Sequence, residues 1–275
     1  MGADATLEPG ILQPRTSARY FDYRNHPSGV RLGAFVSNFW TVTWDLTEPY
    51  VAQVLPSPCV NVSVTNTEAD VTGLVRKRYD RRLQGRGFVV GARFRPACFR
   101  PLYGRPVVEL TDTHAPIATV LGRDTAALAD RVAATDDVEI RVGLLAAFLI
   151  DDLPEPDPVA ARLAQVVEET MRRPDIVRVA QVAELAELSA RQLQRLFGDY
   201  VGASPKWVID RRRMQQAALH GAEGTDGPGP DWSAVATELG FADQAHLTRA
   251  FAATVGRPPG AFAREGAGPG DRRVG

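Results

Sequence analysis

Cysteine, lysine and long apolar stretches are scarce in this chain of 275 residues. Two cysteines, Cys59 and Cys98, cannot provide the several disulfides that hold small secreted domains together, so both are expected to be free thiols. The longest apolar run, residues 142–150, is shorter than the roughly 18 to 20 residues that a membrane-spanning helix needs. Residues 1–10 carry two acidic and no basic side chains. We therefore expect no secretory signal, no membrane partner and a cytoplasmic location.

An excess of charge of either sign is also absent, because 32 basic side chains are balanced by 33 acidic ones. Such a balance neither requires nor excludes nucleic acid as a partner. The chain further lacks a Gly-rich phosphate loop, the HExxH and GxSxG motifs and any Cys-x-x-Cys pair. These absences predict a protein that is not an enzyme and that uses no metal or cofactor.

A proline-rich segment, LPEPDP at 153–158, separates two halves of different character. Three prolines at alternate positions hold this segment extended, so we predict a linker between a first half at 1–152 and a second half at 159–265. The first half is β-rich, and its helical spacing is confined to 124–134 and 136–150. Three stretches alternate as strands do: Trp40, Val42 and Trp44; Val60, Val62 and Val64; and Phe88, Val90, Ala92 and Phe94.

The second half contains an internal repeat. When it is shifted against itself by 54 residues, nine positions carry identical residues, including Phe197 on Phe251. Ser189 falls on Asp243, and both residue types are good N-caps of helices. The repeat predicts one structural unit that is used twice.

Each repeat unit, at about 176–203 and 230–257, has the spacing of a helix-turn-helix: a short helix, a tight turn and a capped second helix. Ser204 as N-cap and Pro205 at the first helical position begin a longer helix that ends near His220 and spaces the two units. A helical repeat used only for packing is the alternative, but solenoids have shorter periods and usually three or more copies. The outward positions of both second helices favour DNA, since they hold Arg, Gln, His and Thr and no Glu.

These motifs resemble the AraC/XylS-type DNA-binding module from Val159 to Glu265. The resemblance is carried by SARQLQRLFGDYVGASPKWV, by the connecting RRRMQQAA and, most specifically, by LGFADQAHLTRAFAATVGRPPGAF. It implies two helix-turn-helix units joined by a helix, with the second helix of each unit in neighbouring major grooves of a double-stranded DNA operator. It also implies a transcriptional regulator, which contacts RNA polymerase if it activates.

The resemblance assigns DNA contacts to both second helices and to the connecting helix. Base reading is implied for Arg191, Gln194 and Arg195 in the first unit, and for Gln244, Ala245, Thr248 and Arg249 in the second. Ala245 departs from the larger polar residues that are frequent at its position, which weakens base reading there. The full set of expected DNA-binding residues is Ser189, Ala190, Arg191, Gln194, Arg195, Arg212, Asp243, Gln244, Ala245, His246, Thr248 and Arg249.

The first half resembles the N-terminal domain that precedes this module in a subset of these regulators, through VLPSPCVNVSV and GFVVGARFRPACFRPLYGRPVVELTD. The resemblance implies an α+β protein whose N-terminal, cupin-like β-barrel binds a small-molecule effector, followed by a helical subdomain that forms a homodimer. A flexible tail is expected at 266–275. Alternating strands with aromatic side chains can enclose a small apolar ligand. The expected ligand-binding residues are Trp40, Trp44, Cys59, Asn61, Arg93 and Phe94.

Other readings of the first half remain open. The aromatic side chains can instead fill the barrel, which leaves an effector-independent regulator whose N-terminal domain only dimerises. Cys59 and Cys98 can serve a thiol- or redox-responsive regulator, although buried cysteines are usually small apolar side chains without chemistry. An alkyl-acceptor enzyme would require four zinc-binding cysteines, and this chain has two. The basic run at 76–86 is expected to be a solvated hairpin turn around Asp80 rather than a phosphate contact.

Overall fold

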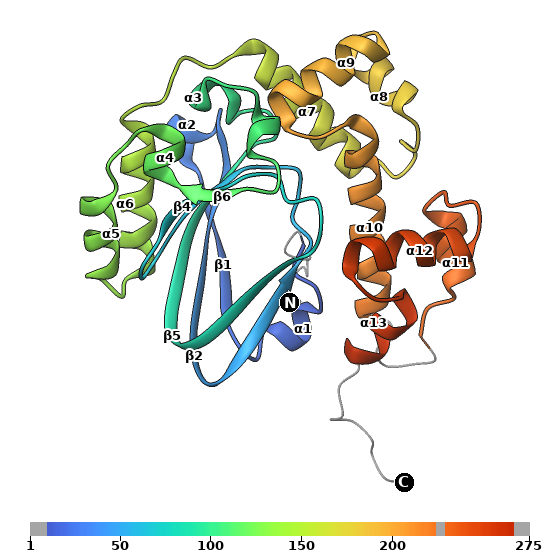
Figure 1. Ribbon diagram of the computed structural model, residues 1–275, viewed down its shortest axis with the longest axis horizontal. Helices are drawn as coiled ribbons and strands as arrows, with labels where there is room; N and C mark the ends of the chain where they lie inside the picture. Colours follow the sequence, from blue (N-terminus) through green and yellow to red (C-terminus); the bar gives the residue numbers. More distant parts are fainter. Residues whose placement is uncertain (1–9, 224–228, 267–275) are drawn as a thin grey trace.

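A strongly bent β-sheet and a helical half make up the protein in the computed structural model, which describes residues 10–223 and 229–266 (Figure 1). The strands are β1 (Asp22–Pro27), β2 (Val36–Val54), β3 (Asn61–Thr65), β4 (Ala69–Thr72), β5 (Tyr79–Phe94) and β6 (His114–Pro116). The helices of the first half are α1 (Pro14–Ser17), α2 (Gly29–Leu32), α3 (Arg100–Tyr103), α4 (Ile117–Leu121), α5 (Ala126–Ala133) and α6 (Val138–Ile150), with a 3-10 turn, η1 (Val107–Leu110). The tail predicted at 266–275 lies outside the described residues, except for residue 266.

The helical half begins directly after the proline-rich segment. Its helices are α7 (Pro158–Arg172), α8 (Val179–Ala186), α9 (Ala190–Leu196), α10 (Pro205–Glu223), α11 (Trp232–Glu238), α12 (Gln244–Val255) and α13 (Pro259–Gly266), and a π-helical turn, η2 (Phe197–Val201), follows α9. None of the described helices combines the length and the apolar character of a membrane span.

The six described strands form one antiparallel sheet in the order β1-β2-β5-β3-β4-β6. β1 and β6 lie at opposite edges, and neither pairs with the other. The α+β class and the cupin-like sheet are therefore confirmed, but the barrel is open. Sequence alternation identifies strands without saying whether the first and last strand meet, which is why closure was not predictable from it.

The long antiparallel pair of β2 and β5, which are not consecutive in the chain, bends back over the sheet instead of closing it (Figure 1). The pairing register shifts between Leu46 and Tyr50 of β2. Three residues of β2 lie between these two pairs, whereas β5 has a single residue there. Gly85, which has a φ of 56°, lies opposite Leu46. An irregularity of this kind bends a strand pair and increases its twist. Residues of both strands beyond the bend thus return across one face of the sheet as a second arm.

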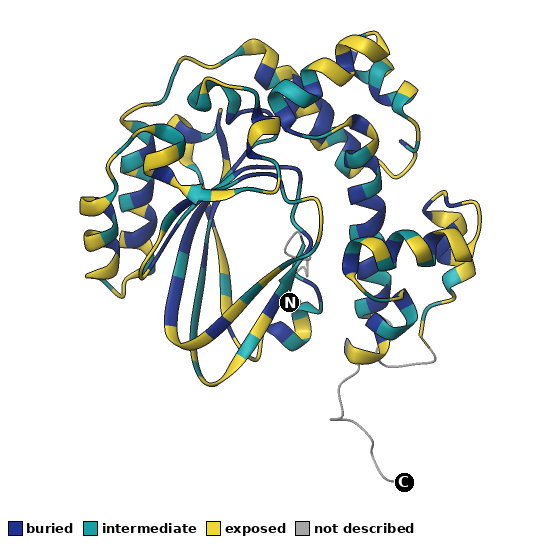
Figure 2. Ribbon diagram, in the orientation of Figure 1, coloured by how far each residue is buried: buried dark blue, intermediate teal, exposed yellow. Residues whose placement is uncertain are grey.

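The other face of the sheet is covered by α5 and α6 (Figure 2). Val62, Val90 and Phe94 point to this side and are fully buried against Leu145 and Leu149 of α6. The helix α6 begins where the sequence predicted, because the Asp137 carboxylate accepts hydrogen bonds from two backbone N–H groups of the first turn. The apolar alternation of β3 and β5 therefore belongs to a closed core.

The three N-caps predicted in the helical half are confirmed, with the Ser204 hydroxyl accepting a hydrogen bond from the Trp207 N–H at the start of α10. The Ser189 hydroxyl accepts a hydrogen bond from the Gln192 N–H at the start of α9, and the Asp243 carboxylate accepts one from the His246 N–H at 2.6 Å at the start of α12. Two separate cores surround α10, one around Phe197 and the other around Phe251. The repeat thus reflects two small helical units that share one long helix.

Candidate functional site

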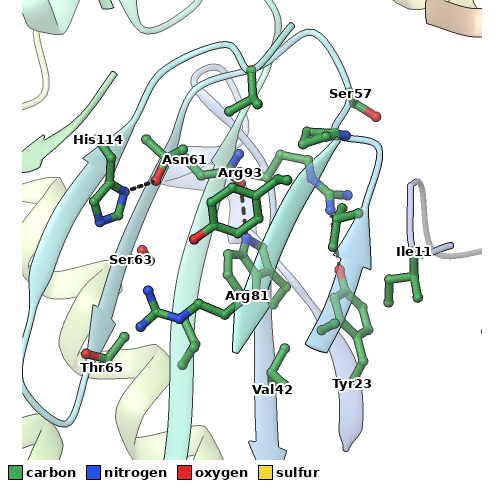
Figure 3. A pocket seen from close by; sticks show the side chains of 18 of the residues that line it. Ile11, Tyr23, Val42, Ser57, Asn61, Ser63, Thr65, Arg81, Arg93 and His114 are labelled. Atoms are coloured by element: carbon green, nitrogen blue, oxygen red, sulfur yellow. Dashed lines mark hydrogen bonds between the residues drawn. The ribbon is translucent and has the colours of Figure 1, made fainter. Parts of the chain in front are cut away.

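A cavity of about 180 Å³ lies between the sheet and its returning arm, and it is called the sheet cavity below. Trp40, Val42 and Val89 line it from the flat part of the sheet, and Tyr79, Arg81 and Leu83 line it from the arm of β5. Figure 3 shows side chains from β1, β2, β3 and β5 converging on this space. The bend of the β2–β5 strand pair therefore creates the cavity.

The floor of the sheet cavity is the indole ring of Trp40. Trp40 pairs with Gly91 across β2 and β5, and a Cβ atom at position 91 would lie only 2.4 Å from the ring. The absence of a side chain at Gly91 allows the indole to lie flat across β5. The ring stacks with Tyr23 at a centroid distance of 6.4 Å and donates its N–H to the Asn61 side-chain oxygen at 3.2 Å. The indole is therefore held as a fixed apolar platform.

Charged groups of the sheet cavity are paired with one exception among the described residues. Arg81 pairs with Glu68 at 3.2 Å, and His114 pairs with Asp70 at 2.9 Å. The guanidinium of Arg93 has no carboxylate partner in residues 10–223 and 229–266, and it donates only a long 3.4 Å hydrogen bond to the Tyr23 hydroxyl. A guanidinium beside apolar side chains without a counter-ion is suited to an anion supplied from outside.

Glu68, Asp70 and His114 are close enough for a metal ion, since their ligand atoms lie within 4.8 Å of one another. Each of them, however, already has a charged partner within the chain, and His114 also contacts the Thr72 hydroxyl at 2.9 Å. This group therefore closes the rim of the cavity through ion pairs.

The two cysteines lie in different places. Cys59 lines the sheet cavity, where Asn61 donates a hydrogen bond to its sulfur at 3.7 Å. Burial raises the pKa of the Cys59 thiol, and burial raises that of Cys98 to about 11. Cys98 packs instead against α7, with its thiol directed at the Ala160 carbonyl. Both are therefore protonated near neutral pH, which disfavours thiol chemistry.

Two of the six predicted ligand residues are wrong for this cavity. Phe94 points to the covered face and is fully buried in the core. Trp44 lies on the same face of β2 as Trp40 but closer to the bend, where it packs against Gly87 and lines a neighbouring hollow instead of the sheet cavity. Arg93 and Phe94 are consecutive, so a strand places them on opposite faces, and they cannot both reach one cavity. Trp40, Cys59, Asn61 and Arg93 do line it.

Sequence reasoning missed cavity residues that come from distant segments. Tyr23, Ser63, Arg81 and His114 all line the sheet cavity. Ser63 was within reach, because it shares its strand face with Asn61. Arg81 was not, because the bend brings it over the sheet, and the predicted turn around Asp80 is wrong: Asp80 lies within β5, paired with Gln53.

The second helices of the two repeat units present their predicted residues to solvent. Arg191, Gln194 and Arg195 of α9 are exposed, as are Ala190 and the cap Ser189. In α12, Thr248 is half-buried and the rest are exposed, namely Asp243, Gln244, Ala245, His246 and Arg249. Within the described part of the chain, Arg191, Arg195 and Arg249 form no ion pair. These guanidinium groups are therefore available to a partner.

Arg212, the remaining predicted DNA contact, is a structural residue instead. It is 2% exposed, and its guanidinium donates to the backbone carbonyls of Arg173 and Ile176, between α7 and α8. Its neighbours in α10 are equally buried: Arg211 donates to carbonyls of the first half, and Arg213 donates to the Leu239 carbonyl at 2.7 Å. A run of arginines predicts a positive surface, but here the helix is buried along much of its length (Figure 2).

Three leucines of the first half complete the cores of the helical half. Leu12 and Leu55 pack in the core around Phe251, and Leu74 packs in the core around Phe197. All three are at most 4% exposed. Hydrogen bonds reinforce this docking. The Arg78 side chain donates to the backbone carbonyl of Val255, and the Gln13 side chain donates to the backbone carbonyl of Phe262.

Residues 182–265 match a family described as a helix-turn-helix domain, and this match covers both exposed second helices. Residues 182–265 are therefore an AraC-type helix-turn-helix domain. A further match joins residues 24–116, from within β1 to the end of β6, to a domain of unknown function, DUF6597. The AraC-type module makes the chain a DNA-binding transcription regulator.

Solved structures of ToxT from Vibrio cholerae resemble the chain at low identity. One, a variant in the apo form, is 14% identical with a TM-score of 0.38 and matches over 82% of this chain and 96% of that chain. Another ToxT structure is 10% identical with a TM-score of 0.38, and the match covers 89% of this chain and 97% of that chain. ToxT with a bound unsaturated fatty acid is 11% identical with a TM-score of 0.37, and the match covers 89% of this chain and 95% of that chain. Comparison with curated proteins gave no match.

Proposed function

We propose that this chain is an effector-controlled transcription regulator. Its AraC-type module binds an operator through α9 and α12, and a small molecule in the sheet cavity changes that binding. The observation that carries this proposal is the arrangement of the three docking leucines, Leu12, Leu55 and Leu74. Each is the immediate sequence neighbour of a residue that lines the cavity, namely Ile11, Val54 and Gly73.

The docking residues lie next to the ends of strands, where neighbouring residues of the chain contact the cavity on one side and the AraC-type module on the other. Successive side chains of a strand point to opposite sides. In the returning arm of β5, Tyr79 and Arg81 face the cavity, whereas Arg78, directly before β5, donates a hydrogen bond to the last residue of α12. A ligand that moves the arm therefore moves the surface on which the second helix-turn-helix unit is docked.

Effector control requires that the ligand bind two states of the protein with different affinity, because equal affinity shifts nothing. Typical coupling between two sites is about 1 to 3 kcal/mol, or about 5- to 150-fold in affinity. By reciprocity, operator DNA changes the affinity for the effector by the same factor.

On the DNA side, one chain should protect two contact regions about 10 base pairs apart. The two units share the helix α10, and their second helices are expected in successive major grooves. Footprinting of the full chain on its operator measures this spacing. A single protected region of about 4 base pairs would contradict the proposed use of both units.

The decisive experiment first selects the operator as genomic DNA fragments that the full-length protein retains. Compounds that raise its melting temperature are then added to an operator titration. We expect at least one of them to change the operator dissociation constant about fivefold or more, and Leu74→Ala to reduce that change while leaving ligand affinity without DNA unaltered. Compounds that bind without altering operator affinity would refute effector control, and failure to retain any fragment would refute DNA binding.

The alternatives are less well supported. A domain that only dimerises needs no cavity, whereas this sheet holds one of about 180 Å³ with an unpaired guanidinium among its described residues. A redox-responsive regulator needs accessible thiolates, and both thiols are buried with raised pKa values. Homodimer formation and contact with RNA polymerase stay predictions.

A further inference from the structure

We infer that the sheet cavity selects a small, flat, singly charged carboxylate with one aromatic ring, whose anionic end pairs with Arg93 and whose ring lies on Trp40. This inference rests on the proposed function, because it names the chemical class of the effector. Three features of the cavity lead to it: the charge balance, the platform and the size.

The charge balance requires one negative charge. The other arginine that lines the cavity, Arg81, is paired with Glu68, and His114 contacts Asp70 at 2.9 Å. Only Arg93 lacks an acidic partner among the residues described. A guanidinium binds a carboxylate through two parallel N–H···O bonds, and this geometry satisfies one positive charge with one negative charge. A dianion such as a phosphate monoester would leave one charge unbalanced.

The platform favours a flat ring. The indole of Trp40 lies flat against β5 because Gly91 leaves room for it, and its edge is tied to Asn61. Arg93 follows Gly91 by two residues on the same face of β5, so the cation lies beside the platform. Offset stacking on an indole is favourable for planar aromatic groups. Apolar side chains of Val42, Val89 and Leu83 complete the surroundings.

The size limits the ligand to about one ring and a short chain. A buried cavity of about 150 Å³ in another protein accommodates benzene. The sheet cavity, at about 180 Å³, is of the same order. Ser63, on the same face as Asn61, offers a hydroxyl group along one side of the space, whereas the Thr65 hydroxyl is engaged with the backbone of Thr67 and Glu68. Because each carboxylate oxygen keeps a second lone pair when Arg93 binds both, the Ser63 hydroxyl can donate a further hydrogen bond to one of them.

The experiment compares cinnamate with cinnamamide, its neutral isostere, and with phenyl phosphate as a dianion, by calorimetric titration of the full-length protein. We expect cinnamate to bind about 10- to 100-fold more tightly than the amide, as for a hydrogen-bonded charge pair. Arg93→Gln should remove this preference, and Arg93→Lys should keep part of it, because lysine retains the charge but not the two parallel hydrogen bonds. The matched control is Arg82→Gln, which removes the same charge from an exposed side chain of the same strand.

Several outcomes overturn the inference. They are equal affinity of the acid and the amide in the wild type, tighter binding of phenyl phosphate, and loss of the preference in the Arg82 control. Loss of the preference in the lysine variant, measured at an unchanged melting temperature, also counts against it. If neutral compounds alone bind and alter operator affinity, the carboxylate is wrong while effector control stands. If carboxylates bind without any change in operator affinity, the ligand class is right and the proposed function is wrong.

Discussion

Replacing Gly91 by alanine should damage the protein, whereas the same replacement at Gly143 should not. A Cβ at position 91 would meet the Trp40 ring at 2.4 Å, but nothing lies within 4 Å of a Cβ at position 143, on the exposed side of α6. Forcing an extra methyl group into a packed contact costs about 1 to 3 kcal/mol. Loss of the hydrogen bond from Trp40 to Asn61 adds about 0.5 to 1.5 kcal/mol. Together we expect Gly91→Ala to lower the free energy of unfolding by about 2 to 4 kcal/mol.

Gly143→Ala removes backbone freedom from the unfolded chain and adds a better helix former, which should stabilise the protein by about 0.5 to 1 kcal/mol. For a protein of this size 1 kcal/mol shifts the melting temperature by roughly 2 to 4 °C. Thermal unfolding followed by circular dichroism should therefore show a loss of about 4 to 16 °C for Gly91→Ala and a small gain for Gly143→Ala. Titration with cinnamate should show weaker binding only for Gly91→Ala. Equal melting temperatures, or unimpaired binding by Gly91→Ala, would refute the platform.

The remaining predictions concern the DNA-binding half and the thiols. Arg195→Ala and Arg249→Ala should each weaken operator binding in gel-shift titrations by about 1 to 3 kcal/mol, the value of a guanidinium bound to a guanine edge; wild-type affinity in both variants would rule out base reading. Arg212→Met should instead lower the free energy of unfolding by about 2 to 4 kcal/mol, because two buried carbonyl acceptors lose their donor, and should leave the salt dependence of operator binding unchanged, because a residue that touches no phosphate releases no counter-ions. A reduced salt slope at unaltered stability would show that Arg212 contacts DNA. Cys98, with its pKa raised to about 11, should be alkylated slowly by iodoacetamide up to about pH 9, since only about one molecule in a thousand is thiolate at pH 8, and burial should protect Cys59 likewise; rapid labelling at pH 7 in mass spectra would contradict this.

Features set by neighbours in the sequence were predictable. The N-caps Ser189 and Asp243, the helix starts after them and the linker before α7 all depend on a few adjacent residues. The repeat added the equivalence of two units, because the same apolar positions recur in both.

Features set by distant segments were not predictable. The alternation around Trp40 and Phe94 indicates strands, but which face is covered by α6 depends on packing far along the chain. Arg212 looks like a DNA contact in the sequence because charged residues are usually exposed, and only the tertiary structure supplies the carbonyl groups that bury it.

The burial of three consecutive arginines in α10 determines how the protein should respond to proteolytic cleavage of its linker. Arg211 donates to the carbonyls of Val75 and Arg76, so its charge is solvated by the first half of the chain. Leu74 in turn fills a core of the AraC-type module. A protease that cleaves the exposed residues of the linker would therefore leave two fragments that stay associated, because separating them would expose an apolar side chain and strand a buried cation. The covalent linker is then a tether of little mechanical importance, and the two halves behave as subunits of a permanent complex.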